Sequence, residues 1–189
     1  MNIIVRVITS LVLLQMVYSQ GNLTNANCVE GDSLIVRLSP KVFRILPSNI
    51  IQYLMSKKYT IPQSWVDSLP HNIISGSFLG SSEINWSVLA SKNGQSRIIV
   101  FPNDTNQSPF ELNIESDIVF LQGMGRSKME YSRYISVAKK EFILKHNDTE
   151  NEPGIQIIDH DGIDDSFAGK ASGVFYFSNG KWIELYGSD

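Results

Sequence analysis

The segment from Asp159 to Asp165, Asp-His-Asp-Gly-Ile-Asp-Asp, gathers four carboxylates and an imidazole within seven residues. Calcium takes about six to eight oxygen ligands, and closely spaced carboxylates on a turning backbone can provide them. Alternate residues of the segment can face one centre, and Gly162 permits a sharp bend. The sequence therefore predicts an acidic loop that holds calcium through Asp159, Asp161, Asp164 and Asp165.

The same seven residues resemble the Asp-x-Asp-Gly-x-Asp-Asp core of thrombospondin type 3 calcium repeats. The resemblance implies that the aspartates are calcium ligands. Those repeats occur in tandem with flanking cysteines, whereas this chain has one copy and no cysteine nearby. An EF-hand loop is not matched, because the order Asp-x-Asp-x-Asp-Gly is missing.

A different chemistry for the segment is acid–base catalysis, since paired carboxylates beside a histidine can move protons. The alternative function is thus a secreted hydrolase that uses the acidic Asp159–Asp165 loop and His160. The chain contains no Gly-x-Ser-x-Gly elbow, no His-Glu-x-x-His helix and no phosphate-binding loop. Catalytic groups meet in space rather than in sequence, so the enzyme alternative stays open beside the favoured non-enzymatic one.

Charge changes sign abruptly around this segment. Residues 126–145 hold six basic and two acidic side chains, a balance of +4, whereas residues 146–165 hold seven acidic and no basic ones. We expect the two stretches to neutralise one another, with a solvated acidic loop as the alternative. The whole chain has a formal charge of only −3, which argues against nucleic acid as a partner.

The N-terminus is typical of a secretory signal peptide. An apolar run from Val7 to Val17 follows Arg6 and is shorter than the roughly 20 residues that span a bilayer. Val17 and Ser19 then provide small side chains for cleavage before Gln20. We expect residues 1–19 to be removed on export, with an uncleaved anchor as the alternative, and no later stretch reaches membrane-spanning length. The sequence thus predicts a flexible segment over 20–32 and one secreted, extracellular globular domain over 33–189.

The single cysteine and the glycosylation motifs matter if the chain is exported. The single cysteine, Cys28, either links two chains in a disulfide-bonded dimer or is an unpaired thiol. The pattern Asn-x-Ser/Thr, which directs N-glycosylation in eukaryotic secretion, occurs five times, at Asn22, Asn85, Asn103, Asn106 and Asn147.

The chain between these features has the pattern of an α+β fold, mainly antiparallel β-sheet. Asn93-Gly94 and Asn179-Gly180 suit the two positive-φ positions of type I′ turns. They predict two hairpins, one joining 84–90 to 97–101 and the other joining 171–177 to 181–186. Helices are expected over 49–58 and 62–69, strands over 33–38, 110–114, 118–121 and 155–158, and a helix followed by a strand within 127–146. This gives about eight strands and two or three short helices.

The last two strands carry Phe175, Tyr176, Phe177, Trp182 and Tyr186. Such a row either faces outward, where it could hold a sugar or a protein, or is covered by a helix. The sequence as a whole favours a secreted, N-glycosylated binding or matrix-type protein, with calcium as its one expected cofactor and an unknown extracellular protein or carbohydrate as its partner.

Overall fold

The computed structural model describes residues 31–124, 128–147 and 157–188. The chain divides into two units, Met1–Leu34 and Ile35–Asp189. The predicted signal peptide and Cys28 lie outside the described residues. Within the described ranges, no helix is both long and apolar enough to cross a membrane.

The first four-stranded sheet has the order β3-β4-β5-β6 and is antiparallel throughout. Its strands are β3 (Ile73–Gly76), β4 (Asn85–Lys92), β5 (Gln95–Phe101) and β6 (Phe110–Ser116). A short pair of strands, β1 (Arg37–Leu38) and β2 (Ile61–Pro62), flanks the 3₁₀-helix η1 (Pro40–Val42) and the helix α2 (Ser48–Ser56).

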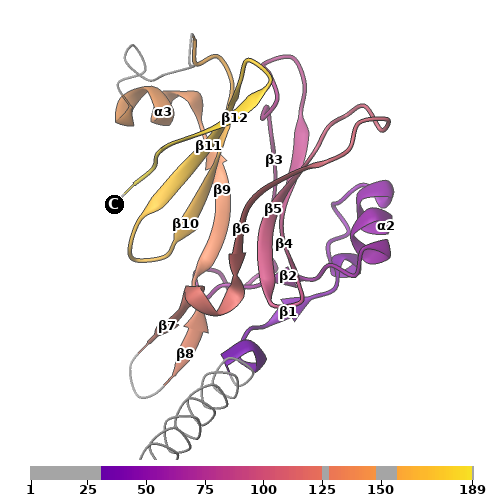
Figure 1. Cartoon of the computed structure of the whole chain (residues 1–189), viewed down its shortest axis with the longest axis vertical. Helices are drawn as coiled ribbons and strands as arrows, with labels where there is room; N and C mark the ends of the chain where they lie inside the picture. The colour runs from indigo at the N-terminus through magenta and orange to yellow at the C-terminus, as the bar shows by residue number, and fades with distance from the viewer. Residues whose placement is uncertain (1–30, 125–127, 148–156, 189) are drawn as a thin grey trace, which may run out of the picture. The chain divides into compact units, whose positions relative to one another are not determined.

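The second four-stranded sheet has the order β12-β11-β10-β9 and is also antiparallel. It comprises β9 (Arg133–Ala138), β10 (Gly162–Phe167), β11 (Ser172–Ser178) and β12 (Lys181–Tyr186), with α3 (Lys140–His146) between β9 and β10. The 3₁₀-helix η2 (Asp117–Phe120) and the strand pair β7 (Leu121–Gly123) and β8 (Met129–Tyr131) connect the sheets (Figure 1).

Both predicted Asn-Gly hairpins are confirmed. Asn93 and Gly94 have φ of 54° and 73°, and Asn179 and Gly180 have φ of 51° and 76°. Each pair lies between directly opposed strand residues, so the two-residue turn fixes the register of its hairpin. The α+β class dominated by antiparallel sheet is confirmed as well.

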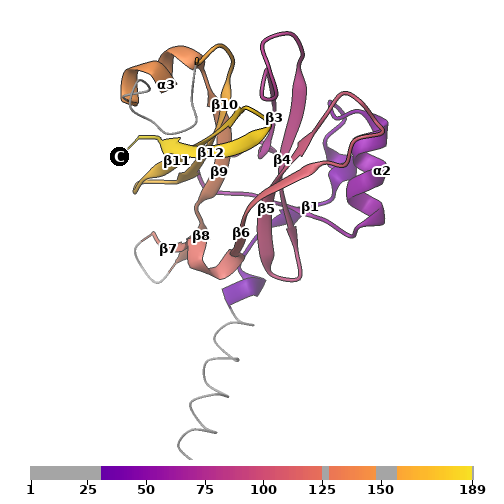
Figure 2. The same cartoon turned by 45° about the horizontal axis from the view of Figure 1, so that its top comes forward.

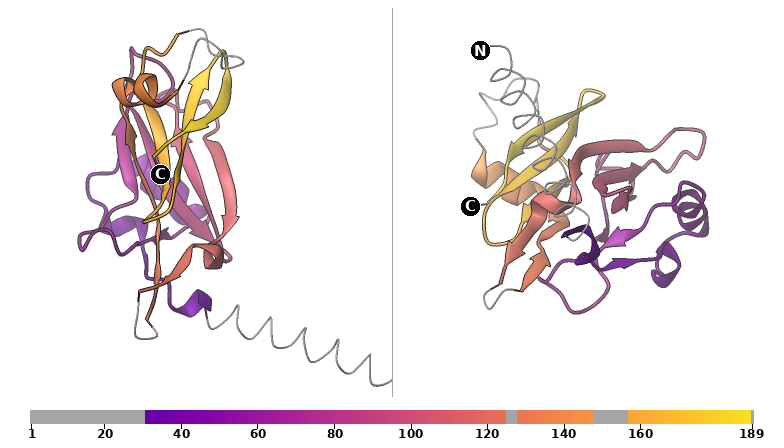
Figure 3. Two further views of the ribbon diagram at one scale, coloured as in Figure 1. Left: turned by 90° about the vertical axis from the view of Figure 1, so that its left-hand side faces the viewer. Right: turned by 60° about the horizontal axis from the view of Figure 1, so that its bottom comes forward.

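The sheets pack face to face, and a helix covers each outer face (Figure 2). Between the sheets, Leu89 and Ile98 of the first belong to the same core cluster as Ile135 and Ile163 of the second. The core under α2 includes Leu54, and the core under α3 includes Ile143, Val174 and Tyr176. Successive residues of a strand point to opposite faces of its sheet. Since both faces here are apolar, the neighbours Leu89 and Ala90 belong to different cores. Figure 3 shows the same layers from two other sides.

Several element predictions are wrong. The described residues form twelve strands rather than about eight, because strands of two or three residues are too short to show an alternating pattern. Residues 62–69 form no helix; His71 Nε2 lies 2.8 Å from Ser64 Oγ and accepts from the Ser64 N–H, which fixes a loop instead. Residues 118–121 are mostly 3₁₀-helix.

The order of elements within 127–146 is also the reverse of the prediction. The strands β8 and β9 come first and α3 follows. Arg133, Ile135 and Val137 share the buried face of β9. Because the first of them is charged, the sequence does not show the apolar alternation that is typical of a strand. The expected strand over 155–158 lies partly outside the described residues, and its described part, Ile157 and Ile158, is not a strand.

The packing of α2 gives a first prediction. Leu54 is fully buried under the sheet, whereas its neighbour Met55 is 38% exposed. Leu54→Ala should lower the free energy of unfolding by about 2–5 kcal/mol, because it removes buried methyl groups and leaves a cavity. Met55→Ala, the matched control, should change it by about 0.5 kcal/mol or less. Urea unfolding measures both, and equal losses would contradict this placement of α2.

Candidate functional site

The acidic segment is not one loop. Asp159 and Asp161 precede β10, and Asp164 and Asp165 lie within it. Successive residues of a strand point to opposite faces of its sheet, so Asp164 and Asp165 face different neighbours. The prediction of a single loop from Asp159 to Asp165 is therefore wrong, because the strand β10 begins at Gly162.

Asp165 points between the two sheets and meets a fully buried arginine. Arg133 Nε donates to Asp165 Oδ1 at 2.9 Å, and Arg133 Nη2 donates to Asp165 Oδ2 at 2.7 Å. The remaining guanidinium hydrogens bond to Ser96 Oγ and O on β5 and to the Asn113 carbonyl on β6. The guanidinium of one sheet thus bonds to two strands of the other.

Asn113 completes this arrangement from a bulge in β6. Its φ of 44° is left-handed, and the pairing of β5 with β6 shifts register between Ser96 and Ile98. Asparagine tolerates this backbone better than most residues. The bulge aims the Asn113 side chain at Asp165, where Nδ2 donates to Oδ2 at 2.7 Å.

Burial and charge act in opposite directions at this pair. Burial lowers the pKa of the Arg133 guanidinium, but the hydrogen bonds and the charge of Asp165 offset this, and the net pKa is raised. The Phe120 ring lies 4.7 Å from the guanidinium carbon of Arg133 and adds a cation–π contact. Burial also raises the pKa of the nearby Tyr131 phenol, which donates to Ser96 Oγ. The cluster therefore contains one buried ion pair, and the charge of Asp117 is close enough to act on both Arg133 and Tyr131.

The other carboxylates of the segment have partners of their own. Lys139 Nζ donates to Asp161 Oδ2 at 2.8 Å. Asp164 Oδ2 accepts from Ser136 and Ser166, while its Oδ1 is buried without a partner. The pairs Arg133–Asp165 and Lys139–Asp161 join the basic stretch to the acidic one at two points.

His160 takes no part in these contacts, and its Nε2 lies 3.9 Å from Asp159 Oδ1. It is buried, stacks on Tyr176 with ring centroids 4.3 Å apart, and places its two ring nitrogens 2.9 Å from the carbonyl oxygens of Asp161 and Phe177. Asp159 is the exposed member of the segment, and its Oδ1 accepts from Tyr176 at 3.3 Å. Both ring nitrogens of His160 thus lie within hydrogen-bonding distance of main-chain oxygens, and a neutral imidazole donates from one of them.

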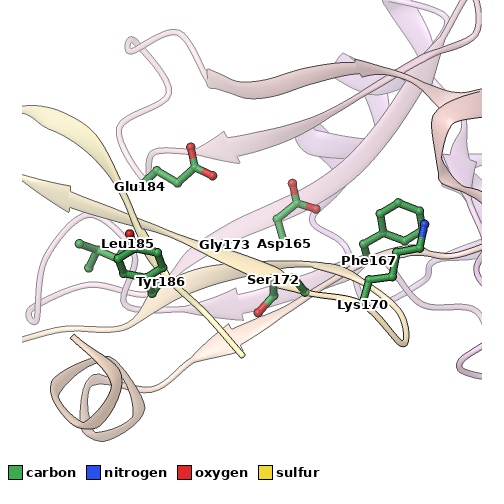
Figure 4. Close-up of a pocket in the computed structure, with 9 residues that line it drawn as sticks. Asp165, Phe167, Lys170, Ser172, Gly173, Glu184, Leu185 and Tyr186 are labelled. Atoms are coloured by element: carbon green, nitrogen blue, oxygen red, sulfur yellow. The ribbon is translucent and has the colours of Figure 1, made fainter. Parts of the chain in front are cut away.

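An open groove of about 740 Å³ lies where β10, β11 and β12 approach the turn after β10 (Figure 4). Asp165 lines it, together with Lys170, Glu184 and the side chain of Tyr186, which is 76% exposed. Lys170 Nζ lies 4.0 Å from the centre of the Phe167 ring. A side chain at Gly173 would place its Cβ 2.8 Å from Glu184 Oε1, so glycine leaves room for Glu184.

The sequence did not single out Lys170 or Glu184 as site residues. Glu184 lies on the same face of β12 as Trp182 and Tyr186. The alternation of these three residues was the one feature of the sequence that could have indicated that Glu184 shares a surface with the aromatic side chains. Nothing in the pattern places it beside Asp165, because the two lie on β12 and β10 and come together only through β11.

The predicted glycosylation sites differ in exposure. Asn103 and Asn106 are exposed, in the loop after β5. Asn85 is fully buried and accepts from the Leu79 N–H, and Asn147 is 8% exposed and bonds to Ile143 and Tyr186. Asn22 lies outside the described residues. A glycan at Asn85 or Asn147 would have to displace buried contacts.

The fold and the groove define an α+β sandwich of two antiparallel sheets, covered by a helix on each outer face and open at one end of the second sheet. Comparisons with protein-family models, with curated proteins and with solved structures give no match.

The ion pair gives a second prediction. Asp165→Asn should lower the free energy of unfolding by about 3–5 kcal/mol, because it leaves the charge of Arg133 buried without a counter-charge. Glu184→Gln is the control, since it removes a carboxylate from the same groove at an exposed position and should cost about 0.5 kcal/mol or less. The double change Arg133→Met with Asp165→Leu should recover much of the loss. Urea unfolding decides, and equal effects of the two single changes would contradict this role of the pair.

Calcium binding by the segment stays a prediction, and a titration can decide it. Among the described residues no group of three or more His, Cys, Asp and Glu side chains is arranged to hold a metal. A shared ion would have to compete with Lys139 for Asp161 and with Arg133 for Asp165. If calcium binds the folded chain through this segment, it should raise Tm relative to a chelator, and Asp161→Ala should abolish the rise. An unchanged Tm would contradict the site.

Proposed function

We propose that this chain is an exported, N-glycosylated extracellular protein that binds a protein or carbohydrate without catalysis, and that the groove beside Tyr186 is its binding site. The observation that carries this proposal is the large exposed aromatic side chain at a groove of about 740 Å³. Tyrosine is among the residues that dominate binding energy at protein surfaces, because its ring is large and has few rotatable bonds.

The backbone of Tyr186 is already fixed. Asn147 Oδ1 accepts from the Tyr186 N–H at 2.9 Å, and Asn147 Nδ2 donates to the Tyr186 carbonyl at 3.1 Å. The amide side chain thus satisfies the main chain at this end of the edge strand β12. A ligand that contacts the ring therefore has to order little of the protein's main chain.

The polar residues of the groove support binding over catalysis. Both oxygens of Asp165 accept from Arg133, and one also accepts from Asn113, so this carboxylate is committed to the fold. No histidine lines the groove as the described residues form it. Glu184 and Lys170 are exposed and of opposite charge, which suits a partner with polar groups.

The hydrolase alternative has one observation in its favour, which is that Asp165 and Glu184 share the groove. A pair of carboxylates is the usual equipment of glycoside hydrolysis. Catalysis would need one of them as acid and the other as base or nucleophile, and Asp165 could serve only by giving up Arg133. This requirement separates the two functions experimentally.

The test is binding of the secreted protein to a printed oligosaccharide array and to a panel of immobilised extracellular-matrix proteins. We expect binding to at least one of these, and a loss of at least about tenfold in Tyr186→Ala, the effect of removing one central aromatic contact. Ile45→Ala is the control, since Ile45 is also exposed but lies between η1 and α2. Intact mass of the same preparation should show loss of residues 1–19 and attached glycan.

Binding that Tyr186→Ala leaves unchanged would contradict the groove as the site. Turnover of glycoside or peptide substrates that is lost in Glu184→Gln would contradict the non-enzymatic function and support the hydrolase. A protein retained inside the producing cell, without glycan, would contradict the extracellular part of the proposal.

A further inference from the structure

A second hollow, of about 320 Å³, lies where α2 approaches β4, β5 and the loop after β5. Three aromatic rings line it, those of Tyr53, Trp86 and Phe101, and Tyr53 meets Phe101 edge to face with centroids 5.4 Å apart. Its polar lining includes Asn49 and Gln107. Within the described chain, none of the lining residues carries a charged side chain.

The loop that closes this hollow carries a glycosylation motif. Asn103 and Thr105, the two defining residues of Asn103-Asp104-Thr105, both line the hollow. Phe101 ends β5 two residues before Asn103, so the strand fixes the ring beside the attachment point. The Asn103 side chain is exposed. A sugar bonded to its Nδ2 would begin at the edge of the hollow.

The first sugar of an N-linked glycan is N-acetylglucosamine, and its chemistry matches the lining. It is neutral, its ring carries C–H groups that can pack on aromatic faces, and its acetamide and hydroxyls can hydrogen-bond to amide side chains such as Asn49 and Gln107. Burial first, and the charge of Glu111 second, raise the pKa of the Tyr53 phenol. Tyr53 therefore stays neutral at physiological pH and presents an uncharged ring.

We propose that this hollow is the seat of the chain's own glycan at Asn103, with the first N-acetylglucosamine packed against Tyr53, Trp86 and Phe101. The attachment makes the contact intramolecular, so a weak ring–sugar contact is occupied at a high effective concentration. The bound sugar ties α2 to the end of β5 and stabilises the fold. This inference rests on the glycosylation in the proposed function.

The other motifs provide a built-in comparison. Asn106 lies three residues further along the same exposed loop but does not line the hollow. The side chains of Asn85 and Asn147 are buried. A stabilising effect of glycan should therefore belong to Asn103 and be absent at Asn106.

The test compares Asn103→Gln with Asn106→Gln, each produced by a eukaryotic secretory host and, without glycan, in bacteria. Glycopeptide mapping first establishes occupancy. We expect Asn103→Gln to lower the Tm of the secreted protein by about 3 °C more than it lowers that of the bacterial protein, the size expected for a single aromatic contact. For Asn106→Gln the two differences should agree. Trimming the glycan to one N-acetylglucosamine should preserve the effect.

A second measurement isolates the aromatic contact. In Tyr53→Ala, and separately in Trp86→Leu, the Tm gain from the Asn103 glycan should shrink, because each comparison is made within one background and cancels the cost of the substitution itself. Ring currents should also move the acetamide methyl proton resonance of the trimmed sugar upfield in the wild type. This readout does not depend on any variant folding.

The possible outcomes separate the inference from the function on which it rests. A secreted protein without glycan at any motif contradicts the proposed glycosylation and this inference together. Occupied Asn103 with equal Tm differences in both hosts, or with an unshifted acetamide resonance, overturns only the seat in the hollow. Export and binding through the groove beside Tyr186 would be unaffected by that result.

Discussion

The buried pair of Arg133 and Asp165 is the constraint on which the arrangement of the two sheets depends. A guanidinium inside a protein is tolerated only when its charge is balanced and its hydrogens are bonded. Here Asp165 on the neighbouring strand supplies the charge, and Ser96 and Asn113 on the other sheet supply the remaining acceptors. One sheet therefore carries the guanidinium and the other carries acceptors for its hydrogens, and these hydrogen bonds fix how the two sheets lie against each other.

The same pair shapes the candidate site. It holds Asp165 at the floor of the groove with both oxygens engaged, and the groove is left with an exposed tyrosine and two exposed charges of opposite sign. Such a surface can recognise a partner, whereas glycoside hydrolysis needs two available carboxylates, and Arg133 engages one of the two in this groove. The structural role of the ion pair is thus the physical reason to favour binding over hydrolysis.

Parts of the fold were predictable because they depend on local chemistry. The Asn-Gly turns require positive φ whatever surrounds them, and the helix at α2 follows from apolar residues on one helical face. The order within 127–146 was missed because Arg133 occupies a core position of β9 and disguises its alternation. The groove was missed because Glu184, Lys170 and Asp165 come from separate elements, and sequence spacing carries no information on which strands become neighbours.

The sequence by itself determined the hairpins and the α+β class, since positive-φ turns and alternating apolar patterns depend on local chemistry. Only the tertiary structure decided what each aspartate does. Antiparallel pairing of β9 with β10 places Asp165 between the sheets and Asp164 on the opposite face, because side chains alternate along a strand. A run that looks like one ligand loop is therefore divided among an ion pair, a surface lysine contact and a serine cluster.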